Sequence, residues 1–193
     1  MSEHLKRLER RIASREARIG VVGLGYVGLP LAVEFGNAGF RVTGIDVDPA
    51  KVASLKAGRS HVEDVPASAV RRLVRGGKLV AQDHYRGCGK LDAIVIAVPT
   101  PLRKTKDPDV SYIVASLAEI AREIRPGQLV ILESTTYPGT TEEVLRPKLE
   151  SRGLRAGKDF FLAFSPERVD PGNAVYTTRT TPKIVGGSTP ACA

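Results

Sequence analysis

A glycine pattern near the amino terminus constrains the fold of this chain more than any other feature. Gly23, Gly25 and Gly28 have GxGxxG spacing, directly after the apolar run 19–22 and directly before a predicted helix. In this context the first glycine allows a sharp turn, the second lets backbone approach a pyrophosphate, and the third lets the helix pack closely on the sheet. The helix would then direct its free N–H groups and its positive dipole end at the phosphates. The pattern predicts a dinucleotide-binding site.

A carboxylate follows where such a site needs one. Asp46 ends the next predicted strand, 18 residues after Gly28, near the roughly 20 expected for the acid that accepts hydrogen bonds from the adenosine ribose. Its charge would repel a 2′-phosphate, so NAD is favoured over NADP, although Arg41 and Lys51 are nearby cations that would offset part of the repulsion. Asp48 is the competing acid, but its place before a proline is typical of a helix cap.

Short apolar runs alternate with helical patterns along the chain, which predicts the α/β class: a doubly wound, mostly parallel Rossmann sheet with helices on both faces. We expect strands at 18–23, 41–46, 78–82, 92–98, 128–133, 159–164 and 183–186, and helices at 27–38, 49–57, 66–75, 110–124 and 139–151. The Pro- and Gly-rich stretch 165–190 is predicted to be irregular chain leading out of the domain. A length of 193 residues allows one such domain with a substantial core, but not two of full size.

An additional helix is expected ahead of the first strand. Leu5, Leu8 and Ile12 recur at helical spacing among many lysines and arginines. We therefore divide the chain into an N-terminal basic helix at 1–17 and an NAD-binding Rossmann domain at 18–193. The helix is interpreted as a solvated basic face with an apolar stripe docked on the domain, and a role in binding a partner or a membrane surface is the alternative.

Composition excludes several classes of function. The formal net charge is +8, but the basic residues are dispersed, aromatic residues make up only 5%, and no nucleic-acid motif is present, so no nucleic-acid partner is expected. The apolar runs are far shorter than the roughly 18–20 residues that cross a bilayer, and the charged amino terminus does not predict a secretory signal. We expect no membrane insertion and a cytoplasmic location. Cys88 and Cys192 are predicted to be free thiols, and the scattered His4, His61 and His84 to be surface residues, so no metal site is predicted.

Polar segments follow three of the predicted strands. Ligands of such sheets bind outside the carboxyl ends of the strands, so these segments contain the site candidates. They are 98–101 (VPTP), 133–140 (ESTTYPGT) and 165–173 (SPERVDPGN). All three should lie at one edge of the sheet, beside the glycine loop.

With these segments the chain resembles the UDP-glucose/GDP-mannose dehydrogenase family, most closely the branch acting on UDP-N-acetylglucosamine or UDP-N-acetylmannosamine. The resemblance rests on Asp46 and on segments 23–30, 98–101, 134–141 and 165–173, and it covers residues 18 to about 190. It implies an NAD-dependent, four-electron oxidation of the sugar C6 alcohol to a carboxylate, through an aldehyde and an enzyme-bound thioester. UDP-glucose 6-dehydrogenase activity is an alternative.

The resemblance also implies roles for single residues. The positions that match cofactor contacts are Gly23, Gly25, Tyr26, Val27, Gly28, Asp46, Lys51, Thr100 and Thr135. Glu167 matches a carboxylate that acts as a base or orients water, Thr135 is a second catalytic candidate, and Glu167, Arg168 and Val169 match positions that contact the nucleotide sugar. Read from the residues alone, the two threonines could instead bond local backbone, and Arg168 could pair with a surface acid.

One part of the family's chemistry has no match. Its nucleophilic cysteine, with the Lys and Asn that assist it, lies in segments corresponding to positions beyond 193, and neither Cys88 nor Cys192 fits that motif. A thioester requires a correctly placed thiolate. We therefore expect the family's central helix and C-terminal substrate domain to be absent here, and the chain to bind NAD and part of a UDP-sugar without turnover. Family members form homo-oligomers largely through that absent region.

Two other classes of function remain open at this stage. The first is a non-catalytic module that binds NAD or a protein partner, the latter through the basic helix. The second is a simpler two-electron dehydrogenase, which the Ser-Pro-Glu-Arg sequence at 165–168 disfavours.

Overall fold

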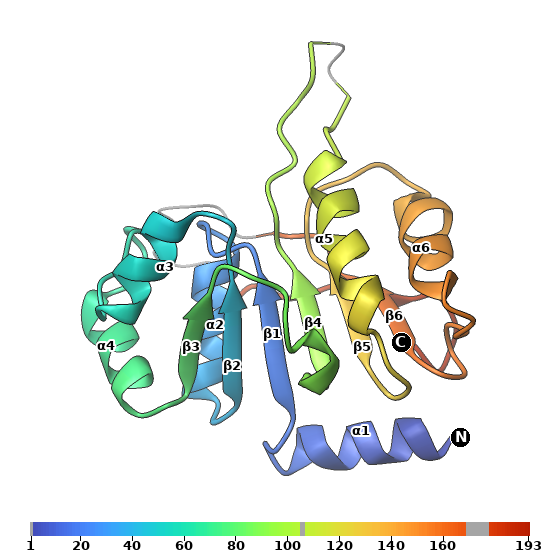
Figure 1. Cartoon of the computed structure of the whole chain (residues 1–193), viewed down its shortest axis with the longest axis horizontal. Helices are drawn as coiled ribbons and strands as arrows, with labels where there is room; N and C mark the ends of the chain where they lie inside the picture. The colour runs from blue at the N-terminus through green and yellow to red at the C-terminus, as the bar shows by residue number, and fades with distance from the viewer. Residues whose placement is uncertain (1, 105–106, 169–177) are drawn as a thin grey trace.

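The computed structural model describes residues 2–104, 107–168 and 178–193. In this part of the chain a seven-stranded sheet has the order β3-β2-β1-β4-β5-β6-β7, and helices cover both of its faces (Figure 1). The strands are β1 (Arg18–Val22), β2 (Arg41–Ile45), β3 (Leu79–Gln82), β4 (Ala93–Ile96), β5 (Leu129–Leu132), β6 (Phe161–Phe164) and β7 (Gly186–Gly187). The helices are α1 (Glu3–Ala13), α2 (Gly28–Asn37), α3 (Pro49–Lys56), α4 (Ala67–Arg75), η1 (Cys88–Lys90), α5 (Ser111–Glu123), η2 (Thr141–Leu145) and α6 (Arg146–Glu150).

The sheet confirms the doubly wound architecture. Every pair from β3 to β6 is parallel. The strand order reverses between β1 and β4, which is where sheets of this type bind their ligands. The first six predicted strands and the helices from α2 to α5 agree with the structure to within two residues at each end.

Alternate residues of the central strands supply two separate cores. In β1, Val21 packs with α2, α3 and α4 on one face, whereas Val22 packs with α5 and α6 on the other. Both side chains are buried, because a parallel strand covered on both faces has no solvent-facing side. The central strands β4 and β5 are therefore apolar throughout.

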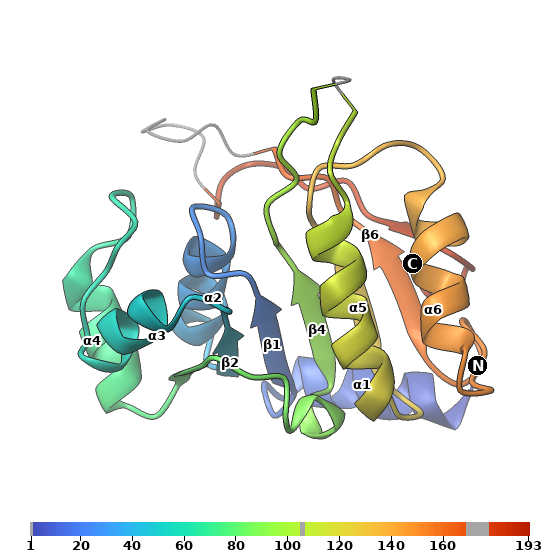
Figure 2. The same cartoon turned by 45° about the horizontal axis from the view of Figure 1, so that its top comes forward.

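Helix α1 lies across the amino ends of the strands, at the opposite edge from the glycine loop (Figures 1 and 2). Its buried residue Leu8 packs against Phe161 and Cys192. Arg11 forms an ion pair with the buried carboxylate of Asp92 at 3.1 Å, and Arg125 approaches the same carboxylate at 3.2 Å. The apolar stripe of the basic helix is thus docked on the sheet domain.

The helix predicted at 139–151 is not one continuous α-helix. Residues Thr141–Leu145 form a π-helical turn, and an α-helix follows over Arg146–Glu150. Pro147 explains the change, because it has no N–H to donate and its ring would clash with the carbonyl four residues earlier. The wider turn accommodates the proline by pairing Arg146 N–H with the carbonyl of Thr141.

The prediction that 165–190 leads out of the domain was wrong for the end of that segment. Chain 186–187 returns to the sheet as an edge strand antiparallel to β6, pairing Ala163 with Gly187. The strand predicted at 183–186 is therefore shifted and shorter. Cys192 is buried just beyond it, and its Sγ accepts a hydrogen bond from Leu162 N–H at 3.3 Å.

Candidate functional site

Each of the three glycines between β1 and α2 meets a different constraint. Gly23 has a φ of +87°, and a Cβ there would lie 2.5 Å from the carbonyl oxygen of Ala97. Gly28 has no room for a side chain, because a Cβ would overlap the carbonyl oxygen of Gly23. Gly25 is different: nothing lies within 4 Å of a Cβ built on it. Two glycines thus shape the loop, and the third leaves open space above it.

The amino end of α2 opens onto that space. Val27, its N-cap, supplies no side-chain hydrogen bond, and the first turn contains no acidic residue. Tyr26 is 65% exposed. A helix end of this kind presents free N–H groups and a partial positive charge to an anion. The loop therefore has the chemistry of a phosphate cradle that needs no lysine.

Asp46, directly after β2, is held beside the loop by backbone donors. Its carboxylate accepts hydrogen bonds from Leu24 N–H at 2.8 Å and from Asp48 N–H at 2.9 Å. Lys51 Nζ lies 3.7 Å from the same carboxylate, which is only 8% exposed as a side chain. Asp48 instead caps α3, accepting from Ala50 N–H at 2.8 Å, as its place before a proline predicts. The assignment of Asp46 as the acid beside the loop is consistent with this geometry.

His61 is exposed, as expected, and it also contacts the glycine loop. Its Nε2 lies 2.7 Å from the carbonyl oxygen of Leu24, the residue between the first two glycines. The imidazole must carry a proton on that nitrogen to donate to the carbonyl. His61 thus helps to fix the loop that Asp46 holds from the other side. No spacing in the sequence links position 61 to position 24.

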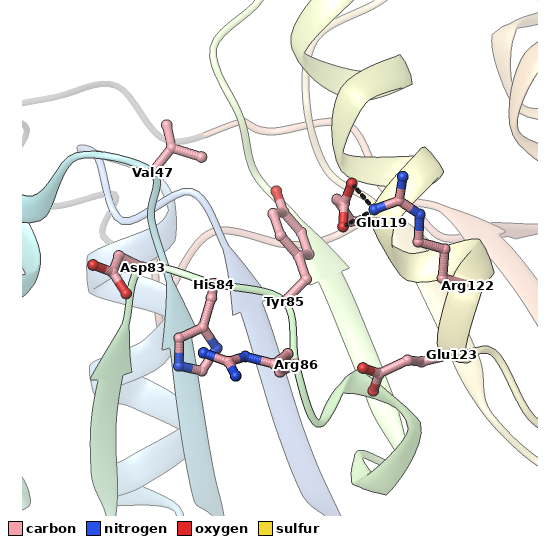
Figure 3. A pocket seen from close by; sticks show the side chains of 8 residues that line it. All are labelled: Val47, Asp83, His84, Tyr85, Arg86, Glu119, Arg122 and Glu123. Carbon is pink, nitrogen blue, oxygen red and sulfur yellow. Dashed lines mark hydrogen bonds and ion pairs between the residues drawn. The ribbon is translucent and has the colours of Figure 1, made fainter.

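A hollow of about 450 Å³ begins next to Asp46 and extends between the β3–η1 connection and α5. Figure 3 shows Val47 at the end of β2 and Tyr85 near the middle, with the ion pair of Glu119 and Arg122 on the helix. The Tyr85 hydroxyl lies 3.0 Å from Ser116 Oγ, and burial raises the pKa of this phenol. In this hollow the flat aromatic ring of Tyr85 lies beside the segment that carries Asp46, the carboxylate predicted to bind a ribose.

The segments after β4 and β5 meet at the same edge, as predicted. Ser134 links them, because its hydroxyl donates to the carbonyl oxygen of Val98 at 2.7 Å. Thr136 and Thr140 hydroxyls lie 2.7 Å apart and stabilise the turn after β5. Within the described residues, the hydroxyls of Thr100 and Thr135 have no hydrogen-bond partner. Neither threonine is used to hold local backbone there, which leaves both available at the edge.

Glu167, the predicted base, belongs to a cluster that the sequence did not reveal. Lys183 Nζ lies 3.2 and 3.3 Å from its two carboxylate oxygens and also forms an ion pair with Glu133. Burial is the main cause that raises the pKa of Glu133, while Lys183 acts in the opposite direction. Arg168 is exposed, and its backbone N–H donates to Glu167 at 2.7 Å. Val169 lies outside the described residues, so its predicted contact with a nucleotide sugar stays a prediction.

Both cysteines are free and buried. Cys88 lies in η1, where burial and two glutamates raise the pKa of its thiol to about 12. Cys192 packs with α1 at the amino edge of the sheet. Among the described residues, no group of three His, Cys, Asp or Glu side chains is placed to hold a metal ion. In the same residues, no helix has the length and apolar character needed to span a bilayer.

The residues at this edge fit a dinucleotide. Space is open above Gly25, where a pyrophosphate would lie, and the α2 N-terminus points at it without a competing side-chain cap. Asp46 stands one strand away with a carboxylate that can also accept from ribose hydroxyls. All cofactor positions predicted from the sequence belong to the loop, to the start of α2 or α3, or to segments that follow strands.

Comparisons with known proteins agree with this geometry. Residues 17–193 match the family described as UDP-glucose/GDP-mannose dehydrogenase family, NAD binding domain. The chain is 38% identical over 180 residues to a UDP-N-acetyl-D-glucosamine 6-dehydrogenase of Pseudomonas aeruginosa, covering 93% of this chain and 42% of that protein. It is 37% identical over 171 residues to a UDP-N-acetyl-D-mannosamine dehydrogenase of Pyrococcus horikoshii, covering 88% of this chain and 41% of that protein.

A solved structure gives the same result. The NDP-N-acetyl-D-galactosaminuronic acid dehydrogenase of Methanosarcina mazei Go1 superimposes with a TM-score of 0.87 at 34% identity, covering all of this chain and 43% of the other. The chain thus spans about two fifths of the length of the relatives that it matches.

Proposed function

Because this chain belongs to the UDP-glucose/GDP-mannose dehydrogenase family, as its NAD-binding domain, we propose that it binds NAD for oxidation of a UDP-N-acetylhexosamine at C6. In this proposal the chain supplies the cofactor site and one side of the sugar site. The observation that carries it is the cradle formed by Gly25, the uncapped start of α2 and the carboxylate of Asp46.

NAD, when bound, would accept the hydride that leaves the sugar C6. The chain's own part is to hold the cofactor and to exclude a 2′-phosphate. Backbone N–H groups at Gly25 and the start of α2 would neutralise the pyrophosphate, and Asp46 would accept hydrogen bonds from the ribose. Lys51, next to Asp46, and the free hydroxyls of Thr100 and Thr135 are proposed to complete the polar contacts.

The adenosine end is proposed to lie over the hollow next to Asp46. Val47 is 72% exposed and offers an apolar surface at the end of β2, and Tyr85 offers an aromatic face from the next connection. An adenine ring needs apolar contact on its faces and few hydrogen bonds. The ion pair of Glu119 and Arg122 in the hollow would remain in contact with water.

The substrate class rests on the relatives and on the segment after β6. The two curated relatives above are a UDP-N-acetyl-D-glucosamine and a UDP-N-acetyl-D-mannosamine dehydrogenase, which favours a UDP-N-acetylhexosamine over UDP-glucose. Glu167 is proposed to take the proton from the C6 hydroxyl or to orient water, with Arg168 and Val169 beside the nucleotide sugar. A carboxylate is suited to this step because it can accept one proton reversibly.

We further propose that residues 1–193 bind NAD without completing the oxidation alone. A thioester needs an accessible thiolate near the bound sugar. Cys88 is buried as a thiol with its pKa raised to about 12, and Cys192 is buried at the opposite edge of the sheet. A cytoplasmic location, homo-oligomer formation by longer family members and the absence of a nucleic-acid partner remain predictions.

Isothermal titration calorimetry with NAD and NADP, together with a steady-state assay on UDP-sugars, tests these proposals. We expect NAD to bind more tightly than NADP and the assay to show no sustained NADH formation. Equal affinity for both cofactors would contradict the role of Asp46. Sustained turnover by this chain would contradict the proposal that it cannot complete the reaction.

A further inference from the structure

Three charged residues from separate segments meet at the carboxyl edge of the sheet. Glu133 directly follows β5, Glu167 lies three residues after β6, and Lys183 lies three residues before β7. The Lys183 ammonium contacts Glu133 Oε1 and lies 3.2 and 3.3 Å from the Glu167 oxygens. One ammonium therefore bridges two carboxylates. We call these residues the Glu–Lys–Glu triad.

The triad is largely shielded from water and carries more negative than positive charge. The side chains of Glu133, Glu167 and Lys183 are 6%, 9% and 24% exposed. Two carboxylates and one ammonium give a formal charge of −1. The charged groups that act on Glu133 from the packed segments are Lys183, which favours its ionised form, and Glu167, which opposes it.

Within the described part of the chain, Lys183 forms ion pairs with both carboxylates. The residues from 169 to 177, which follow Arg168, include no Lys or Arg. Arg168 itself is exposed and contributes its backbone N–H to Glu167. Shielding raises the affinity of a group with one excess negative charge for a proton, because the neutral set loses less hydration.

We propose that Lys183 is a positioning residue that holds Glu167 at the sugar site and, together with Glu133, makes the triad an acceptor of a single proton. This inference rests on the proposed function, because it assumes that Glu167 faces the reacting C6 hydroxyl. Glu133 and Lys183 have no role in the assignments made from the sequence.

The proton balance of the first oxidation step fits such an acceptor. The C6–H bond breaks and its electron pair leaves as hydride to NAD, while the C6 O–H bond breaks and its proton forms an O–H bond on a triad carboxylate. The sugar becomes an aldehyde, and the triad changes from −1 to neutral. Because the proton goes to a carboxylate in this step, the part of Lys183 is to fix geometry and charge.

Titration of Glu133 in the complete 193-residue chain tests this inference. The side-chain carboxyl ¹³C resonance of Glu133 is followed against pH in wild type and in K183M, K183R and E167Q, with K148M, at an exposed site on α6, as the matched control. K183M should raise the pKa of Glu133, since its cation is lost. E167Q should lower that pKa, since the opposing carboxylate is lost. The pKa of Glu133 in K183R and in K148M should stay close to its value in wild type.

The opposite directions of the two shifts distinguish a coupled triad from a purely structural ion pair. A Glu133 titration midpoint unchanged by both K183M and E167Q would overturn the inference, as would shifts of the same sign. If K183M does not fold, as judged by circular dichroism, the E167Q and K183R titrations decide by the same criteria.

NAD calorimetry on the same samples separates this inference from the proposed function. Normal NAD affinity, together with a Glu133 pKa that responds to neither K183M nor E167Q, would refute the triad and leave the cofactor site intact. Coupling without any NAD binding would refute the cofactor site, and with it the role given to the triad.

Discussion

Two contrasting substitutions test the glycine loop, because its glycines are required for different reasons. Gly25→Ala adds a methyl group to open space at a residue whose φ is not positive. Gly23→Ala adds the same methyl group at φ +87°, 2.5 Å from the Ala97 carbonyl oxygen. We expect the first variant to fold and lose NAD affinity, and the second to lose stability.

The magnitudes follow from these two environments. For Gly23→Ala, the left-handed backbone costs about 1–2 kcal/mol and the overpacking about 1–3 kcal/mol, so the free energy of unfolding should fall by about 2–5 kcal/mol. In a domain of this size that lowers Tm by roughly 4–20 °C. For Gly25→Ala, stability should change by no more than about 0.5–1 kcal/mol. Losing one charge-assisted hydrogen bond to the pyrophosphate, about 1.5–3 kcal/mol, should weaken NAD binding roughly 10- to 100-fold.

Thermal unfolding and NAD calorimetry on the two variants measure both effects. Wild-type NAD affinity in Gly25→Ala would refute the assignment of the open space to the pyrophosphate. A Tm of Gly23→Ala equal to that of wild type would refute the steric argument for the loop.

Three further predictions concern other parts of the molecule. Asp46→Asn should reduce the preference for NAD over NADP in calorimetry. It should also lower the free energy of unfolding in urea by about 1–3 kcal/mol, because the Leu24 and Asp48 N–H groups bond different carboxylate oxygens and an amide has only one oxygen. The pKa of Cys88 is raised from 9.0 to about 12, so the stabilisation from its buried thiol is present below pH 9.0 and lost as pH rises toward 12; Cys88→Ala should flatten this alkaline fall in stability. Leu8→Ala should lower the free energy of unfolding in denaturant by about 2–3 kcal/mol without changing NAD affinity, because α1 is docked through this residue at the amino edge of the sheet. An unchanged unfolding midpoint would show that α1 does not stabilise the sheet domain.

Local sequence patterns were sufficient to predict the parallel part of the sheet. Strands such as 93–96 are continuous apolar runs, and α5 has an apolar stripe that ends before Pro126 and Gly127. Each of these patterns can be recognised within a short stretch of neighbouring residues. The edge strand β7 has no such signal, because Gly186 and Gly187 pair with β6 only through backbone.

The glycine loop and Asp46 were predictable because their spacing is fixed by one strand–helix–strand unit. Glu133 and Lys183 were not, since they are 50 residues apart and meet only after β5 and the chain before β7 are brought together. His61 was missed for the same reason: its contact with Leu24 depends on how the segment after α3 folds back over the loop. Side chains that support a site from distant segments leave no periodic pattern.

A crystal structure of this chain grown with NAD is the most direct test of the central claim. We predict the pyrophosphate within hydrogen-bonding distance of the Gly25 N–H and the first turn of α2, and the adenosine ribose hydroxyls on Asp46. Electron density for NAD at any other place, or a glycine loop filled by protein side chains in the presence of NAD, would contradict it.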